Sequence, residues 1–84
     1  MNVRPIVYEK GTTKVYENAN GTYQVVYVRN YSFDGWVEPT EFAETFDKDG
    51  MHSSGGVCTH NFPVRYADDG LTLKERAIKF ANGL

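Results

Sequence analysis

The stretch VYENANGTYQVVYVRNY, residues 15–31, places four tyrosines around the dipeptide Asn20-Gly21. Asn-Gly is a strong signal for a two-residue β-hairpin turn of type I′, because this turn needs a positive φ at both central residues. If these two residues form the loop, Tyr16 lies opposite Val25 on the neighbouring strand. The stretch therefore predicts a central β-hairpin, around which the other segments can be arranged.

This register sorts the hairpin into two faces, because side chains alternate along a strand. One face is mainly aliphatic and suits a hydrophobic core; it carries Val15, Val26 and Val28, with Glu17 and Gln24 towards the turn. The other face carries Lys14, Tyr16, Tyr23, Val25, Tyr27 and Arg29. The sequence leaves open whether this tyrosine face is core or surface, since that depends on where residues 38–46 pack.

The segments on either side of the hairpin extend the prediction. Residues 4–9, RPIVYE, indicate a short strand followed by a turn. Residues 32–36, SFDGW, indicate a turn. Residues 38–46, EPTEFAETF, fit either a helix or a strand; Thr40 after Pro39 can serve as an N-cap, which favours a short helix.

Two further segments precede the C-terminus. Residues 47–56, DKDGMHSSGG, predict a loop from their content of Gly, Ser and Asp. Residues 57–66, VCTHNFPVRY, alternate as a strand does. Pro63 places that strand at a sheet edge, because proline cannot donate to a ladder.

The C-terminus carries the signals of a helix. Thr72 and Glu75 fit a capping box, and Gly83 after Asn82 supplies a stop at a position that favours a left-handed backbone. One apolar stripe at helical spacing should face a sheet: Leu73, Ala77, Phe80, Ala81 and Leu84. The sequence therefore predicts a single α+β domain over residues 1–84, a small antiparallel sheet of about three to five strands packed against a C-terminal helix.

Composition and charge exclude several classes of function. A net charge of −2 and a pI near 5.6 disfavour a dedicated nucleic-acid binder. Cys58 is the only cysteine, so no internal disulfide can form. No apolar run has the length of a signal peptide core or a membrane span, so we expect a cytoplasmic protein without membrane contact. No catalytic or cofactor motif is present, and we expect neither an enzyme nor a cofactor.

His52, Cys58 and His60 are the only imidazole and thiol side chains in the sequence. Cys58 and His60 would project side by side from the predicted edge strand, and three such ligands can hold a zinc ion. The chain lacks CxxC or HxxxH spacing, however, and a single Cys is usually a small buried apolar residue. Metal binding is therefore a minor alternative, and no ligand is assigned.

GTYQVVYVR, residues 21–29, suggests a second alternative. Residues 14–31 and the position of the C-terminal helix resemble the three-stranded DNA-reading domains of some recombinases and AP2-type factors. Those domains lay a sheet in the major groove and back it with a helix, so the resemblance implies nucleic-acid binding through the hairpin. The reading face offers only Lys14 and Arg29 to phosphates, which makes nucleic acid a poor partner.

Acidic residues are concentrated between Asp34 and Asp49. Six of the eleven acids lie there against the single base Lys48: Asp34, Glu38, Glu41, Glu44, Asp47 and Asp49. Four rings are interleaved with them: Phe33, Trp36, Phe42 and Phe46. One interpretation is a solvated face over a small aromatic core. The other is an acidic, ring-bearing patch that docks into a basic groove of another protein, where rings provide affinity and charge speeds encounter.

The sequence favours a non-catalytic protein-binding module that inhibits or modulates a larger, basic protein, for example one that itself binds nucleic acid. An 84-residue chain without enzyme motifs resembles the small accessory and anti-defence proteins of phages, which implies the same kind of role. The contacts that we expect are Trp36, Glu38, Glu41 and Glu44, with Tyr16, Tyr23 and Tyr27 as a second surface. A homodimer that buries the tyrosine face is a further alternative.

Overall fold

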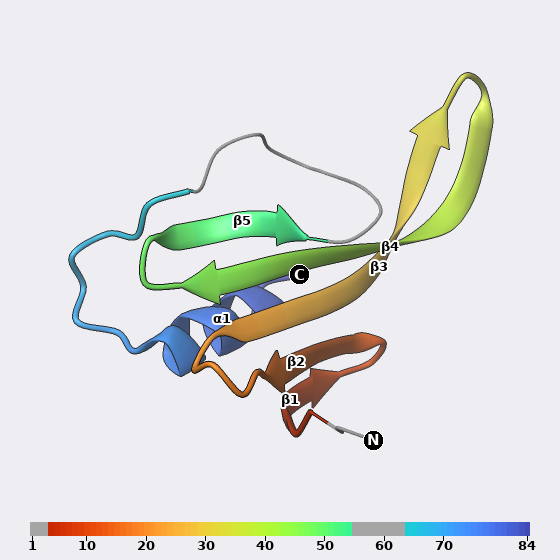
Figure 1. The fold of residues 1–84 in the computed structure, drawn as a ribbon. Coiled ribbons are helices and arrows are strands. Elements are labelled where there is room, and N and C mark those ends of the chain that lie inside the picture. Colours follow the sequence, from red (N-terminus) through yellow and green to blue (C-terminus); the bar gives the residue numbers. More distant parts are fainter. Residues whose placement is uncertain (1–3, 55–63) are drawn as a thin grey trace.

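The computed structural model describes residues 4–54 and 64–84, which form one antiparallel sheet and one helix. The sheet follows chain order, with neighbouring strands joined as hairpins, and the helix covers one of its faces (Figure 1). The elements are β1 (Ile6–Lys10), β2 (Thr13–Glu17), β3 (Tyr23–Phe33), β4 (Trp36–Asp47), β5 (Gly50–Ser54) and α1 (Leu73–Asn82). The predicted α+β class, an antiparallel sheet packed against a C-terminal helix, is confirmed.

The two-residue turn predicted at Asn20-Gly21 is wrong. The last paired residues of β2 and β3 are Glu17 and Tyr23, so a longer loop joins the strands. Of the two dipeptide residues only Gly21 has a positive φ, +85°, whereas a type I′ turn needs both. The pairs are Lys14–Val26, Val15–Val25, Tyr16–Gln24 and Glu17–Tyr23.

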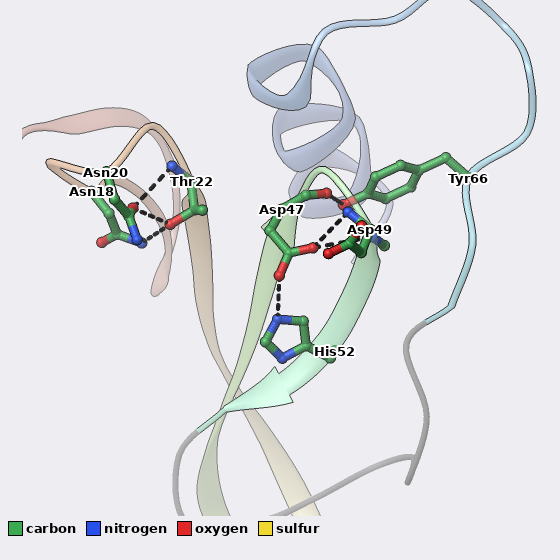
Figure 2. A network of polar contacts seen from close by, with 8 residues as sticks. Asn18, Asn20, Thr22, Asp47, Asp49, His52 and Tyr66 are labelled. Atoms are coloured by element: carbon green, nitrogen blue, oxygen red, sulfur yellow. Dashed lines mark hydrogen bonds and ion pairs between the residues drawn. The ribbon is translucent and has the colours of Figure 1, made fainter.

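Polar contacts hold this longer loop in one conformation. The Asn18 N–H donates to the carbonyl of Thr22 over 2.9 Å, and the Gly21 N–H donates to the carbonyl of Asn18 over 3.1 Å. Figure 2 shows the side chains: the Asn20 Oδ1 accepts from the hydroxyl of Thr22 over 2.7 Å, and the same hydroxyl accepts from the Asn18 amide over 2.9 Å. The loop therefore fixes the register by its own hydrogen bonds.

The corrected register moves side chains to the opposite faces of the sheet, because a slip of one residue inverts the alternation. Val15, Val25 and Tyr27 share the face that α1 covers, and all three are buried. Val26 and Val28, predicted to be core, lie on the other face; Val28 is exposed. The predicted division into an aliphatic face and a tyrosine face is therefore wrong.

Residues 38–46 form a strand, so the predicted short helix is wrong. β4 pairs with β3 continuously from Trp36 to Phe46. The predicted turn over residues 32–36 is confirmed, and it has the type I′ geometry that was expected elsewhere: Asp34 and Gly35 have φ values of +48° and +84° between the paired residues Phe33 and Trp36. Pairing along the whole strand outweighs the weak capping signal at Thr40.

The predicted loop over residues 47–56 is wrong in its first part. A tight turn joins the paired residues Asp47 and Gly50, and β5 continues to Ser54. Most of the predicted edge strand over residues 57–66 lies outside the described residues. Val64 forms one isolated bridge with Met51, and residues 65–67 are not in a strand.

The predicted capping box of α1 is confirmed. The Thr72 hydroxyl accepts from the Glu75 N–H over 3.2 Å, and the Glu75 carboxylate accepts from the Thr72 N–H over 2.9 Å. The left-handed conformation predicted for Gly83 is wrong: its φ is −86°, and its N–H donates to the carbonyls of Lys79 and Phe80. α1, the one helix in the described residues, is not long and apolar enough to cross a membrane.

The core lies between α1 and the covered face of the sheet. Its buried side chains come from β2, β3, β4 and α1: Val15, Val25, Tyr27, Phe42, Phe46, Ala77 and Ala81. The small residues Ala77 and Ala81 bring α1 close to the sheet, and the Phe80 ring fills the space beside Tyr27 and Phe46, with ring centroids 6.0 Å and 5.6 Å away. At the far end of α1 the Asn82 side chain accepts from the Tyr8 hydroxyl over 3.0 Å, which ties the helix to β1.

The register can be tested with a pair of isosteric substitutions. Val25→Thr should lower the free energy of unfolding by about 1–3 kcal/mol, because a hydroxyl enters a dry core. Val26→Thr places the same hydroxyl on the open face, the face of the sheet opposite α1, and should lower the free energy of unfolding by less than about 0.5 kcal/mol. Urea denaturation of both variants measures the difference. An equal or larger loss for Val26→Thr would contradict the observed register.

Candidate functional site

β3 and β4 continue beyond the rest of the sheet as a two-stranded ribbon, residues 28–41, which we call the arm. β2 pairs with β3 only as far as Val26, and β5 pairs with β4 only from Ala43 onward. The arm projects away from the body of the protein, with the Asp34-Gly35 turn at its tip (Figure 1). Its six residues of β3 span about 20 Å.

One face of the arm continues the face of the sheet that packs against α1. Beyond the pair of Arg29 with Thr40, the register pairs Tyr31 with Glu38 two residues further along β3 and Phe33 with Trp36 four residues further along. Because side chains alternate along a strand, these side chains lie on the same face as Tyr27, which is closer to the body of the protein. This surface, which we call the ring face, consists of Arg29, Tyr31, Phe33, Trp36, Glu38 and Thr40.

The rings along this face become steadily more exposed towards the tip. Phe42 at the base is 8% exposed, Tyr31 is 42% exposed, Phe33 is 67% exposed and Trp36 is 74% exposed. Tyr31 contacts the core ring of Phe42, with centroids 6.3 Å apart. Phe33 and Trp36 contact no other ring in the described part of the chain. The strand backbone, and not packing against other rings, therefore positions Phe33 and Trp36.

The ring face is hollowed near the tip. Tyr31, Phe33, Trp36 and Glu38 line a shallow pocket of about 300 Å³. Three of these groups are aromatic and one is a carboxylate. Such a surface can accept an apolar side chain with a basic group at its edge.

The acidic residues predicted to form one patch are distributed over different places. Glu38 lies on the ring face and Glu41 on the opposite face of the arm, because they are separated by an odd number of positions on β4. Glu44 is buried, with 1% of its surface exposed, so the prediction that it is a surface contact is wrong. Trp36 is exposed as predicted.

Glu44 lies inside because it shares the covered face of β4 with Phe42 and Phe46, two residues before and two residues after it. Its carboxylate accepts hydrogen bonds from the hydroxyl of Tyr27 over 3.1 Å and from the hydroxyl of Ser53 over 3.2 Å. Burial, together with the nearby charge of Glu44 and this hydrogen bond, raises the pKa of Tyr27 to about 12. From residue type alone, a glutamate is expected to be exposed. Only the pairing of β4 with β3 reveals that Glu44 lies inside.

The three tyrosines predicted as a second contact surface do not share a face. Tyr27 is in the core, and Tyr23 packs against it from the same side. Tyr16 lies on the opposite face of the sheet, where the Arg4 guanidinium sits 4.4 Å from its ring centre. The tyrosine surface therefore does not form.

The two bases on which nucleic-acid reading depends are also separated. Lys14 pairs with Val26 on the open face, whereas Arg29 lies on the ring face, with its guanidinium 5.7 Å from the centre of the Tyr27 ring. The Lys14 ammonium lies 3.8 Å from the carboxylate of Glu9. The arrangement gives a phosphate backbone no paired contacts from these bases.

Tyr31, which helps to complete the ring face, was missed by the sequence prediction, and Phe33 was predicted as a ring of the acidic patch but not as one of the expected contacts. Asp34-Gly35 between alternating residues is itself a signal for a two-residue hairpin. Applied there, it places Phe33 opposite Trp36 and so brings the rings together. The stronger Asn-Gly signal upstream concealed it.

A second pocket, of about 450 Å³, lies between α1 and residues 66–71. Arg76 on its wall is engaged within the chain: it forms an ion pair with Asp69, donates to the carbonyl of Ala67 over 3.2 Å and lies 4.6 Å from the ring centre of Tyr66. These contacts hold the segment against the helix, so a structural role accounts for this arginine.

His52, the one candidate metal ligand within the described residues, is bound to a carboxylate instead. Its Nε2 lies 2.8 Å from the Asp47 Oδ2 (Figure 2). In residues 4–54 and 64–84 no three His, Cys, Asp or Glu side chains gather into a group that could hold a metal. Cys58 and His60 lie outside the described residues.

Asp47 organises the turn between β4 and β5. Partial burial by itself raises the pKa of Asp47, but the N–H of Asp49, the ring of His52 and the N–H of Gly50 stabilise the carboxylate, and the net effect lowers that pKa. The N–H donors lie 2.8 Å and 3.2 Å from Oδ1. The Tyr66 hydroxyl donates to the Asp47 carbonyl over 2.7 Å, which fastens the turn to the segment before α1 (Figure 2).

Asp47→Asn should lower the free energy of unfolding at neutral pH, and the loss should shrink on acidification. A lowered pKa means that the folded state favours the ionised carboxylate. This stabilisation is complete above the ordinary value of 3.8 and is lost as the pH falls through the lower folded-state value. Urea denaturation at neutral pH and below that value measures it, with Asp49→Asn in the same turn as the control. A loss that grows on acidification would contradict this role.

Comparison with protein-family models, with curated protein sequences and with solved structures finds no match.

Proposed function

We propose that the protein is a non-catalytic binding module that inserts the ring face of the arm into a groove of a larger, basic protein and thereby inhibits or modulates it. The observation that supports this most strongly is the exposure of Phe33 and Trp36, 67% and 74%, on a ribbon that no other described element covers. Exposed rings gathered in one place mark interaction surfaces, because water solvates them poorly.

The arm has the features of an interaction hot spot. Trp and Tyr dominate binding energy when they enter a desolvated pocket, and charged groups around them exclude competing partners. Tyr31, Phe33 and Trp36 provide the rings, and Glu38 lies at their edge. Only Tyr31 is braced by the core, so the outer rings can settle against a partner.

Charge supports a basic partner. The arm carries the three carboxylates Asp34, Glu38 and Glu41 against one guanidinium, Arg29, which gives 1 − 3 = −2. An acidic projection is drawn towards a basic groove, and the attraction raises the association rate more than the final affinity.

Trp36→Ala should weaken capture of the partner. Immobilised wild-type protein and the variant would be incubated with lysate of the source organism, and retained proteins identified by mass spectrometry. Ile6→Ala is the control, because Ile6 is an exposed apolar residue on β1, away from the arm. The partner should be retained by wild type and Ile6→Ala and bind Trp36→Ala about 30-fold more weakly. Equal affinity for all three would overturn the proposal.

Glu38→Lys should slow association with the captured partner and weaken its dependence on salt. Asp68→Lys is the control, because it makes the same change in net charge at an exposed position outside the arm. Surface-plasmon-resonance kinetics at low and high ionic strength separates the two. Identical effects of both substitutions would show that net charge, and not the arm, attracts the partner.

A further inference from the structure

Both outer edges of the arm run without a neighbouring strand in residues 4–54 and 64–84. Towards the tip of the arm, the pairing of β2 with β3 reaches only Val26, and the pairing of β5 with β4 reaches only Ala43. An exposed strand edge presents free N–H and C=O groups, which another strand can pair with. The two edges differ, because β4 contains Pro39.

Pro39 shows which residues point outward. It is paired with Asn30, and because proline has no N–H its nitrogen must face away from β3. Antiparallel strands alternate inward and outward groups, so Asn30 and Ser32 on β3 also direct their N–H and C=O outward. The β3 edge is therefore a continuous row of donors and acceptors, whereas the β4 edge is interrupted at Pro39.

We propose that two copies of this chain join through the β3 edges of their arms, forming a four-stranded ribbon in which the two ring faces lie side by side. The self-association needs no other protein, so it stands or fails separately from the proposed function. It would also double the ring face that a partner meets.

The shape of the edge sets the register. β2 pairs with β3 as far as Val26, and its first residue, Thr13, lies one position further, at the level of Tyr27. The strand of a second copy therefore has to end before that level. A two-fold arrangement centred on Tyr31 meets this condition, with residues 29–33 of the two copies running antiparallel. Asn30 of each copy then exchanges backbone hydrogen bonds with Ser32 of the other.

This register also brings complementary side chains together. Arg29, the one base of the arm, comes to lie beside Phe33 of the other copy and next to its cross-strand neighbour Trp36, so that a guanidinium meets exposed rings. The two Glu38 side chains lie on the outer strands, about 14 Å apart across three strand spacings, which exceeds the screening length of about 8 Å at physiological salt. Pairing through β4 would instead bring these carboxylates together.

Sedimentation velocity over a range of concentrations tests the dimer. The wild type should show a reversible monomer–dimer equilibrium. Asn30→Pro should remain monomeric, because it removes an outward donor while leaving the bonds between β3 and β4 intact. Val37→Pro makes the matched change on the β4 edge and should dimerise like the wild type. A monomeric wild type, or a dimer of Asn30→Pro, would overturn the proposal. The first result would mean that an extended segment of another protein, and not a second copy, pairs with this edge.

Cross-linking supplies a test that does not depend on how well Asn30→Pro folds. In a Cys58→Ser background, Tyr31→Cys should give a reducible disulfide dimer under mild oxidation, because the proposed register puts the two residues about 4.5 Å apart between Cα atoms. Val37→Cys, on the opposite strand, should form no disulfide dimer under the same conditions. Equal yields from both variants, or no dimer from Tyr31→Cys, would contradict the proposed pairing.

Discussion

The loop between β2 and β3 is the constraint on which the rest of the structure depends. The bond from the Asn18 N–H to the Thr22 carbonyl, 2.9 Å long, sets Val15 opposite Val25. This choice turns Tyr27 towards α1, and a slip of one residue would turn it away. Because β4 pairs with β3 along its length, the same choice places the rings of the arm on one side. The core and the ring face are two ends of one stripe.

Glu44 is the single buried carboxylate of this stripe in the described residues. Burying a charge without hydrogen bonds is costly, so its place depends on the hydroxyls of Tyr27 and Ser53. These contacts link β3, β4 and β5. The body of the protein is thus held by apolar packing and by a polar contact across three strands, while the arm beyond it is held by strand pairing.

The sequence predicts those features whose signals are local. The capping box at Thr72 and the apolar stripe of α1 depend on neighbours within one or two turns. The capping box is observed, and four residues of the stripe pack in or against the core: Ala77, Phe80, Ala81 and Leu84. The loop at Asn20-Gly21 is harder to predict, because a glycine with positive φ also occurs within a five-residue loop. Only the pairing of β2 with β3 distinguishes that loop from a two-residue turn. Phe42 and Phe46 lie four apart, a spacing that fits both a helix and a strand.

The candidate site was predictable in part for the same reason. Trp36 stands out as the only tryptophan in an acidic segment, and it is exposed. Tyr31 and Phe33 join Trp36 because of the pairing across the Asp34-Gly35 turn. Glu44 does not belong to this surface because it is buried. Residue type indicated the kind of surface, and strand pairing decided its members.

Photocrosslinking from position 36 shows whether the arm contacts the partner while the body only supports it. Trp36 replaced by p-benzoylphenylalanine would be expressed in the source organism and irradiated, with the same replacement at Ile6 as the reference. Position 36 should give one dominant adduct with another protein, and position 6 should give none. Adducts of equal yield from both positions, or none from position 36, would contradict this expectation.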